Sequence, residues 1–347
     1  MLNNNESLSF SPKSAAIITM YKCTAKCKDC CFSCSPNEKE ILSLTDIKNF
    51  IKEISSFSDI SSIVWTGGEC TLLGDKLIDG LTYAKKLGLS SRIVTNCSWA
   101  TSKNKVLHFL TRLKNAGLEE INLSTGDSHQ EFIKIDKIIT VTEISLELGI
   151  RVLISVENTK YSKFDIDDLR DSPEYKKIKE RDKNGLVTAI PSSWISFGEQ
   201  SYDYDESAFI EKKNGCNSLY NTIALNPKGD LLSCCGLTVR YMPEMHLGKA
   251  SLGKVVPLYN QQKNDFLKQW LFTSGPINIL KQVKIWDKNI ELPRFVHPCQ
   301  ACAYLFQTPE ITKIIKDNYH TIIEEITEKF YQKLYFKQAF EQRLEDN

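Results

Sequence analysis

The chain has 347 residues, of which 25% are charged, and a formal net charge of +1 at pH 7. This length can bury one or two cores, and the balanced charge indicates neither nucleic acid nor a membrane surface as a partner. The polar start at residues 1–14 lacks the apolar core of a signal peptide, and no apolar run approaches the ~20 residues that span a bilayer. We therefore expect a cytoplasmic protein, in which the twelve cysteines are reduced and favour metal binding over disulfides.

Short apolar segments alternate with helical patterns from residue 15 to about 196. Strands are predicted at 15–20, 62–66, 92–96, 120–125, 150–157 and 186–196, and helices at 44–57, 76–86, 103–115 and 133–148. Thr45 is expected to cap the first of these helices and Gly88 to end the second. Repeated strand–helix units predict an α/β fold with a parallel sheet, and six units suit a partial (β/α)6 barrel. Functional residues in such sheets follow the carboxyl ends of the strands.

The pattern changes after residue 200. Residues 201–214 are polar, as in a linker or surface loop, and a turn signal at 226–230 between two apolar segments predicts a hairpin. Helical patterns follow at 266–286, and one long charged helix is expected at 310–343, packed on the body or on a partner. We expect three regions: a barrel over 1–200, a small region over 201–308 and a terminal helix over 309–347. Only ~14 residues precede the first strand, so we expect no separate recognition domain there.

Five cysteines lie between Tyr21 and Pro36. Three of them, Cys23, Cys27 and Cys30, are spaced C-x3-C-x2-C, which allows their thiolates to converge on one soft metal centre. Three ligands are one fewer than a 4Fe–4S cluster needs, so one iron would stay open to a small chelating molecule. The alternative is a zinc knuckle in which Cys31 or Cys34 supplies the fourth thiolate.

Gly67, Gly68 and Glu69 follow the second predicted strand. Glycines without side chains allow a ligand to approach the backbone closely, and the carboxylate of Glu69 can hold an ammonium group. Without a second motif, two glycines at a strand end indicate only a turn.

Polar residues also follow the third and fourth predicted strands. Asn96 ends the third strand, where the residue pattern indicates a simple turn; the family resemblance described below implies a contact near a ribose instead. Ser124 and Asp127 end the fourth strand, where they suit ribose hydroxyls or a carboxylate; Asp127 could instead cap the next helix. His129 is interpreted as structural.

A second group of cysteines follows the polar segment. Cys299 and Cys302 are spaced C-x2-C, Cys234 ends the predicted hairpin and Cys216 precedes it. Four thiolates from distant segments can close a 4Fe–4S or a zinc site. Cys235 is then left over, and because neighbouring side chains on a strand point to opposite faces, its thiol should point away from what Cys234 touches. The alternative for Cys235 is a small buried apolar side chain.

The C-x3-C-x2-C motif after an N-terminal strand, combined with Gly67-Gly68-Glu69, resembles the radical S-adenosylmethionine (SAM) enzymes. The resemblance implies that the first three cysteines hold a 4Fe–4S cluster whose open iron binds SAM, and that reduction yields a 5′-deoxyadenosyl radical. It also implies that the Gly-Gly-Glu segment holds the amino group of SAM. Asp29 stands where the family usually has an aromatic residue, and Cys97 stands where it usually has a glycine.

Three further details resemble the epipeptide-type radical epimerases, which convert L-residues of a ribosomal peptide to D-residues. They are CCFSCSP at 30–36, the Cys234-Cys235 pair and CQACAYLF at 299–306. This resemblance implies an auxiliary 4Fe–4S cluster in the C-terminal region, with Cys235 as the hydrogen-atom donor. It also implies a ribosomally made peptide as substrate and an external electron donor of the flavodoxin or ferredoxin type.

Two alternatives remain open at this point. The radical could instead form a thioether or carbon–carbon crosslink in a peptide, with Cys235 as a ligand or a packing residue. The chain could also be a non-catalytic zinc or iron–sulfur module that binds a partner.

Overall fold

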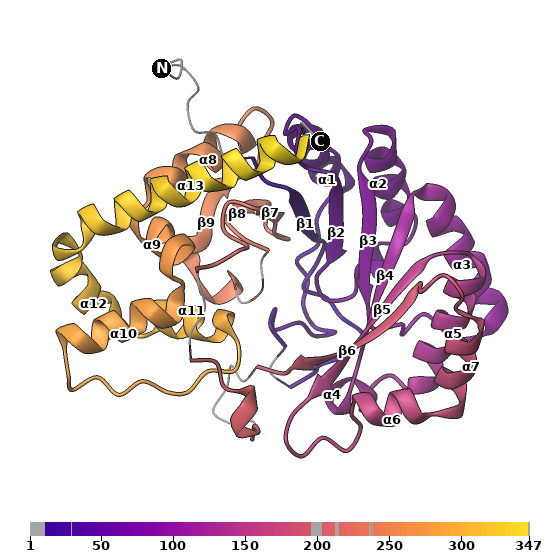
Figure 1. The fold of residues 1–347 in the computed structure, drawn as a ribbon. Coiled ribbons are helices and arrows are strands. Elements are labelled where there is room, and N and C mark those ends of the chain that lie inside the picture. Colours follow the sequence, from indigo (N-terminus) through magenta and orange to yellow (C-terminus); the bar gives the residue numbers. More distant parts are fainter. Residues whose placement is uncertain are drawn as a thin grey trace.

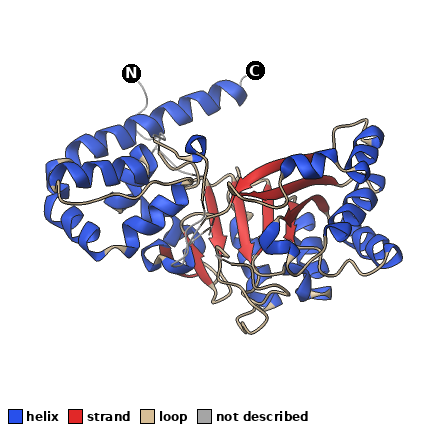
Figure 2. Cartoon of the chain, turned by 90° about the horizontal axis from the view of Figure 1, so that it is seen from below, coloured by secondary structure: helices blue, strands red, loops and turns tan. Residues whose placement is uncertain are grey.

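A computed structural model describes residues 11–28, 30–195, 203–211, 215–235, 237 and 239–345, with side chains up to residue 336. The described residues contain one large sheet flanked by helices (Figure 1). Seen from below, strands occupy the middle of the molecule and helices lie at both ends (Figure 2).

Nine strands form this sheet in the order β6-β5-β4-β3-β2-β1-β7-β8-β9. All neighbours from β6 to β7 are parallel, whereas β7, β8 and β9 are antiparallel to each other in turn. The strands are β1 (Ser14–Ile18), β2 (Ser62–Thr66), β3 (Ser90–Thr95), β4 (Leu118–Thr125), β5 (Arg151–Asn158), β6 (Val187–Ser193), β7 (Thr222–Leu225), β8 (Asp230–Leu232) and β9 (His246–Lys249). The sheet therefore continues without a break from the expected barrel into the hairpin that follows residue 214.

Helices between the parallel strands lie on the outer side of the curved row of strands (Figure 1). They are α1 (Leu44–Ile54), α2 (Asp75–Lys86), α3 (Lys103–Ala116), α4 (Asp127–Gln130), α5 (Ile135–Glu147), α6 (Ile166–Asp171) and α7 (Pro173–Arg181). The C-terminal helices are α8 (Val255–Gln261), α9 (Phe266–Ser274), α10 (Pro276–Trp286), α11 (Pro298–Gln307), α12 (Pro309–Asn318) and α13 (Ile323–Glu345). None of the helices within the described ranges is both long enough and apolar enough to cross a membrane.

Alternation along the strands builds the core between sheet and helices. Ile63, Trp65, Ile93, Ile121 and Ile154 are fully buried toward the helices, and each such side chain contributes roughly 1.5–3 kcal/mol through burial. The residues between them face the interior of the curved sheet, where the side chains are mostly small or polar. The interior therefore stays open enough to receive a ligand.

Helix α1 shows how the local sequence determines an element. Its apolar residues at 47, 50, 51 and 54 recur at helical spacing and are all buried. The prediction that Thr45 caps this helix is wrong, because the side chain of Ser43 accepts the hydrogen bond from Asp46 N. The six predicted barrel strands are confirmed, with shifts of at most three residues at their ends.

The prediction of a single long helix over 310–343 is also wrong. The chain forms α12, then a short 3-10 turn at Tyr319–Thr321, then α13. At the break, Asn318 Nδ2 donates to Ile314 O at 2.9 Å and Thr321 Oγ1 donates to Asn318 O at 2.8 Å. Side-chain bonds of this kind compete with helical backbone bonds, and they allow the chain to turn here. Helices α6 and α7 were not predicted.

Candidate functional site

A cavity of ≈ 590 Å³ lies inside the curved sheet and reaches the carboxyl ends of its strands. One wall comes from the cysteine loop between β1 and α1, and another comes from the turn that follows β8. Eight of the residues that the sequence singled out line it: Cys23, Cys27, Cys30, Gly67, Gly68, Asn96, Ser124 and Cys235. The structure thus brings residues that are more than two hundred positions apart to one space.

The Gly67–Gly68 segment packs directly on the start of the cysteine loop. Gly68 N donates to Met20 O at 2.8 Å, and Glu69 N donates to Lys22 O at 3.0 Å. A Cβ on Gly68 would meet Lys22 O at 2.0 Å, so only glycine permits this approach. Gly67 has φ 127°, a conformation that L side chains rarely adopt. The two glycines therefore let the end of β2 support the loop that carries the cysteines.

The three motif cysteines differ in their electrostatic surroundings. Burial raises the pKa of Cys23 to about 11 and raises that of Cys27 as well. The thiols of Cys31 and Cys34 donate hydrogen bonds to Cys30, which lowers its pKa. Burial disfavours the thiolate forms of Cys23 and Cys27 unless a cation binds them, so the donor chemistry fits an iron–sulfur cluster.

Asn96 connects the end of β3 to the cysteine loop. Its Nδ2 donates to Thr24 Oγ1 at 3.1 Å and lies 3.5 Å from Cys23 Sγ. The side chain is buried, with 6% of its surface exposed. Asn96 therefore contacts the loop itself as well as the cavity.

Glu69 does not line the cavity, although the sequence suggested that its carboxylate could hold an ammonium group. It is fully buried and accepts hydrogen bonds from Thr71 N, Thr71 Oγ1, Thr95 Oγ1 and Asn96 N, at 2.6–3.2 Å. Burial raises its pKa, while these four donors lower it. The carboxylate thus holds the ends of β2 and β3 together beneath the cavity.

Asp127 is also turned away from the cavity. Its carboxylate oxygens accept from Lys163 N at 2.8 Å and Phe164 N at 3.1 Å, so it holds the loop after β5. The helix-cap alternative does not describe it either, because Asp127 is the first residue of α4 and Gly126 is the N-cap.

Two titratable residues that sequence reasoning did not assign to the site line the cavity instead. Glu157 is the last residue but one of β5, is 3% exposed and accepts from Ser128 N and Ser128 Oγ, both at 2.9 Å; burial raises its pKa. Burial lowers the pKa of His129 to about 4, and its Nδ1 has no partner among the described residues. The rule that found Asn96, a polar residue at the carboxyl end of a strand, also applies to Glu157.

Trp194 closes one side of the cavity. Its Nε1 donates to Lys28 O at 2.8 Å, and its ring meets that of His129 edge-to-face with centroids 5.2 Å apart. Phe32 also lines the cavity and is buried. Aromatic rings thus flank the cysteine loop. Asp29, which stands where the resemblance implies an aromatic residue, lies outside the described residues.

A second, small cavity of ≈ 40 Å³ lies behind the turn that carries Cys235. Its lining includes the five cysteines of the second group: Cys216, Cys234, Cys235, Cys299 and Cys302. Cys299 and Cys302 are one turn apart on α11, and His297 caps that helix by accepting from Cys299 N at 3.1 Å. The structure therefore brings together all members of this group.

The expectation that Cys234 and Cys235 point to opposite faces is wrong. Strand β8 ends at Leu232, so strand alternation does not extend to this pair, and both side chains line the second cavity. The Cys234 thiol donates a hydrogen bond to Cys235, which lowers the pKa of Cys235 to about 6. Cys235 alone of the two also lines the large cavity, and it therefore separates the two spaces.

The described residues contain no group of three or more His, Cys, Asp or Glu side chains that could hold a metal ion. What places the members of each cysteine group together is that they line the same cavity. None of the twelve cysteines, all of which are among the described residues, forms a disulfide.

Comparisons with known proteins agree with this arrangement. Residues 17–159 match the model of the radical SAM superfamily. The chain is 26% identical over 163 residues to YydG of Bacillus subtilis (strain 168). The name of YydG describes it as a peptide biosynthesis protein. That match spans 46% of this chain and about half of YydG, 51%.

Two solved structures of anSMEcpe, with bound AdoMet and the Cp18Cys or Kp18Cys peptide, have a similar fold. Their TM-scores are 0.52 and 0.50, at 13% and 12% sequence identity, and each comparison covers 91% of this chain and 99% of the other. At this identity the likeness concerns the fold alone, and the predicted α/β class with a mostly parallel sheet is confirmed.

Proposed function

We propose, from the premise that residues 17–159 of this chain are a radical SAM domain, that the protein inverts selected residues of a ribosomally made peptide from L to D. The observation that carries this proposal is the single cavity lined by Cys23, Cys27 and Cys30 on one side and by Cys235 on another. A radical enzyme that inverts a carbon needs a hydrogen acceptor and a hydrogen donor on opposite faces of it. The cavity offers a position for each.

The radical SAM domain implies SAM and a 4Fe–4S cluster, and the residues of the cysteine loop fit this cluster by donor chemistry. When bound there, SAM on the reduced cluster supplies a 5′-deoxyadenosyl radical that takes a hydrogen atom from a peptide Cα. In our proposal Gly67, Gly68, Asn96 and Ser124 contact SAM, because all four line the cavity. Glu69 and Asp127 act indirectly, by holding the strand ends and the loop around it.

Cys235 is the proposed donor of the returning hydrogen atom. Its S–H bond breaks as the new Cα–H bond forms. The sulfur radical that remains takes up one electron and one proton, with the electron coming from an external donor of the flavodoxin or ferredoxin type. Trp194 and Phe32, which flank the cysteine loop, help to exclude water from the reacting atoms.

The second group of cysteines is proposed to hold an auxiliary 4Fe–4S cluster. Cys216, Cys234, Cys299 and Cys302 would be its ligands, within a C-terminal region over residues 201–308 that joins the barrel of residues 1–200 to the terminal helices of 309–347. This cluster would fix the Cys235 segment from behind.

The peptide substrate is proposed on two supports. YydG, which matches part of this chain, carries a name that refers to peptide biosynthesis, and anSMEcpe binds peptides beside AdoMet within a similar fold. The inner wall of the cavity is rich in small polar side chains, including Ser14, Asn122 and Ser155, which suit the amide groups of an extended peptide.

The proposal is tested with the anaerobically reconstituted protein, SAM, a reductant and a candidate ribosomally made peptide, in heavy water. Epimerisation predicts one deuterium per inverted residue and no other change of mass. Cys235→Ala should abolish the D-residue while 5′-deoxyadenosine still forms. An unchanged yield of D-residues in this variant would remove Cys235 from the reaction.

One observation favours a second candidate, a peptide crosslinking enzyme. Cys235 lines the second cavity beside Cys234, as a cluster ligand would. Crosslinking removes two hydrogens for each bond formed, so a loss of mass without deuterium uptake would select this function instead.

A further inference from the structure

Arg240 connects the turn after Cys235 to the loop of the first cysteine group. It lies in a short 3-10 helix, Val239–Tyr241, five positions after Cys235. Its Nη1 donates to Phe32 O at 2.8 Å and to Ser33 O at 2.9 Å. Its Nη2 pairs with Glu38 at 2.9 Å, and its guanidinium lies 4.2 Å from the ring centroid of Tyr21. One side chain thus contacts the cysteine loop at four places.

The contacts fall where the loop most needs support. Ser33 has φ 48°, a left-handed conformation that is unfavourable for a residue other than glycine. The carbonyls of Phe32 and Ser33 lie between Cys31 and Cys34, and both accept from Nη1 of the planar guanidinium, which fixes their orientation. The Arg240–Glu38 pair is three-quarters buried, so solvent screens it less than an exposed pair.

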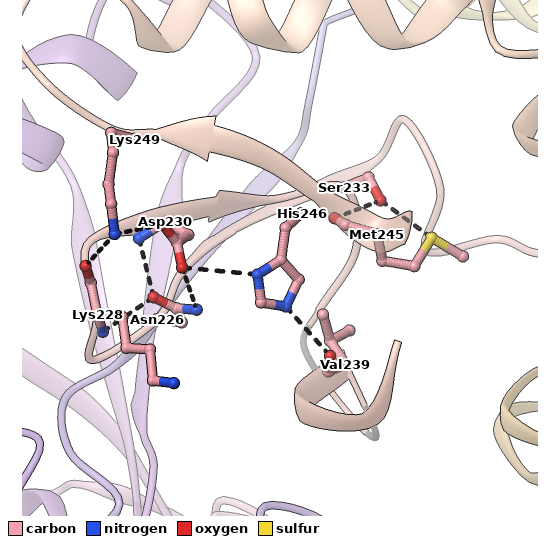
Figure 3. A network of polar contacts seen from close by, with 8 residues as sticks. All are labelled: Asn226, Lys228, Asp230, Ser233, Val239, Met245, His246 and Lys249. Carbon is pink, nitrogen blue, oxygen red and sulfur yellow. Dashed lines mark hydrogen bonds and ion pairs between the residues drawn. The ribbon is translucent and has the colours of Figure 1, made fainter. Parts of the chain in front are cut away.

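Val239, the residue before Arg240, contacts the β8–β9 hairpin through His246 (Figure 3). His246 Nε2 lies 3.2 Å from Val239 O, and the same ring faces Asp230, which pairs with Lys249 at 2.6 Å. Ser233 N donates to Met245 O at 3.0 Å at the start of the turn. The Cys234–Cys235 segment is therefore held between the hairpin on one side and Arg240 on the other.

We propose that Arg240 is a positioning residue that fixes the Cys235 thiol relative to the first cysteine loop, so that hydrogen return depends on it more than hydrogen abstraction does. This inference rests on the proposed function. Abstraction needs only the cysteine loop and its cofactor, whereas return needs the donor at the correct distance on the opposite side of the cavity. A misplacement of about 1 Å can lower the rate of such a step about a hundredfold.

The test measures two products in parallel. In Arg240→Gln we expect 5′-deoxyadenosine to form at a rate close to that of the unsubstituted protein, while D-residues formed per 5′-deoxyadenosine fall by at least about tenfold. Arg240→Lys keeps the charge and loses the paired donors. Its yield of D-residues per 5′-deoxyadenosine should lie between those of the unsubstituted protein and of Arg240→Gln. Arg294→Gln is the matched control. Arg294 also pairs with a carboxylate, that of Glu206, and lies over an aromatic ring, that of Phe209, but it lines neither cavity.

A readout without turnover separates this inference from the proposed function. In the cluster-free protein, alkylation of Cys235 followed by peptide mass mapping should be several times faster in Arg240→Gln than in Arg294→Gln. Cys70, which is fully buried under β3, serves as the internal reference for global unfolding. Faster labelling of Cys235 alone supports the inference even if the unsubstituted protein makes no D-residue, in which case only the proposed function fails.

Three results would overturn the inference. They are an unchanged ratio of D-residues to 5′-deoxyadenosine in Arg240→Gln, a parallel loss of both products with Cys70 labelled as fast as Cys235, and an unchanged rate of Cys235 alkylation.

Discussion

Asn96 and Glu69 are joined by a hydrogen bond beneath the large cavity, from the backbone N of Asn96 to Oε2 of Glu69 at 2.9 Å. The amide of Asn96 then continues to the cysteine loop, where Nδ2 lies 3.5 Å from Cys23 Sγ. The first cysteine is thereby connected to the ends of two strands through one buried carboxylate. The site therefore depends on the hydrogen bonds of Glu69 and Asn96 as well as on its thiols.

Removing the carboxylate should destabilise the fold. Glu69→Ala leaves four buried donors at the ends of β2 and β3 without their acceptor, at a cost of about 1–3 kcal/mol or more. Urea unfolding of the cluster-free protein measures this change. Glu119→Gln is the control, because the pair of Glu119 with Arg151 is exposed, and its loss should change the free energy of unfolding by less than about 1 kcal/mol. Equal stabilities of the two variants would contradict the assigned role of Glu69.

Gly68 offers a test of the contact between β2 and the cysteine loop. In Gly68→Ala the new Cβ would overlap Lys22 O, which must move, and Cys23 is the next residue. We expect this variant to bind much less iron after reconstitution, as measured by iron analysis and absorbance.

Gly88→Ala is the control for that variant. Gly88 has φ 77° and open space around it, so the alanine costs about 1 kcal/mol of strain without touching the loop. Full iron content in Gly68→Ala would contradict a close packing of the two segments.

His129 should make stability depend on pH. Its pKa in the folded protein is lowered to about 4 by burial, compared with about 6.5 in the unfolded chain. Between these values the unfolded chain binds a proton that the folded protein does not, so the free energy of unfolding falls as the pH falls, by up to about 3 kcal/mol for this group.

Urea unfolding at several pH values between 7 and about 4.5 measures this dependence. His129→Phe keeps a ring against Trp194 and should flatten the dependence, whereas a substitution of the exposed His108 should not. The same slope in all three proteins would show that His129 is not held neutral by its surroundings.

The sequence predicts the scaffold well because the scaffold depends on local patterns. Apolar runs bounded by turn residues located all six barrel strands, and the strand-end rule located Gly68, Asn96 and Ser124 at the cavity. The same rule extended to Glu157 would have found it, at the last position but one of β5. The break between α12 and α13 escaped prediction because it depends on two side chains that bond to backbone carbonyls instead of continuing the apolar face.

Side-chain directions at the site depend on partners that are distant in sequence. Glu69 turns away from the cavity because Thr95 and Asn96, more than twenty-five positions later, supply its donors. Cys97 has φ 63°, a backbone conformation that favours glycine. The contacts of Arg240 with residues 21–38 carry no local pattern at all, and only the folded chain reveals them.

The most direct measurement is the cleavage of SAM by the anaerobically reconstituted protein after reduction. We predict that 5′-deoxyadenosine and methionine form in the unsubstituted protein and in Cys235→Ala, and that neither forms in Cys23→Ala, Cys27→Ala or Cys30→Ala. A fully iron-loaded, reduced protein that leaves SAM intact would contradict the role assigned to the cysteine loop and, with it, the radical reaction proposed for the cavity.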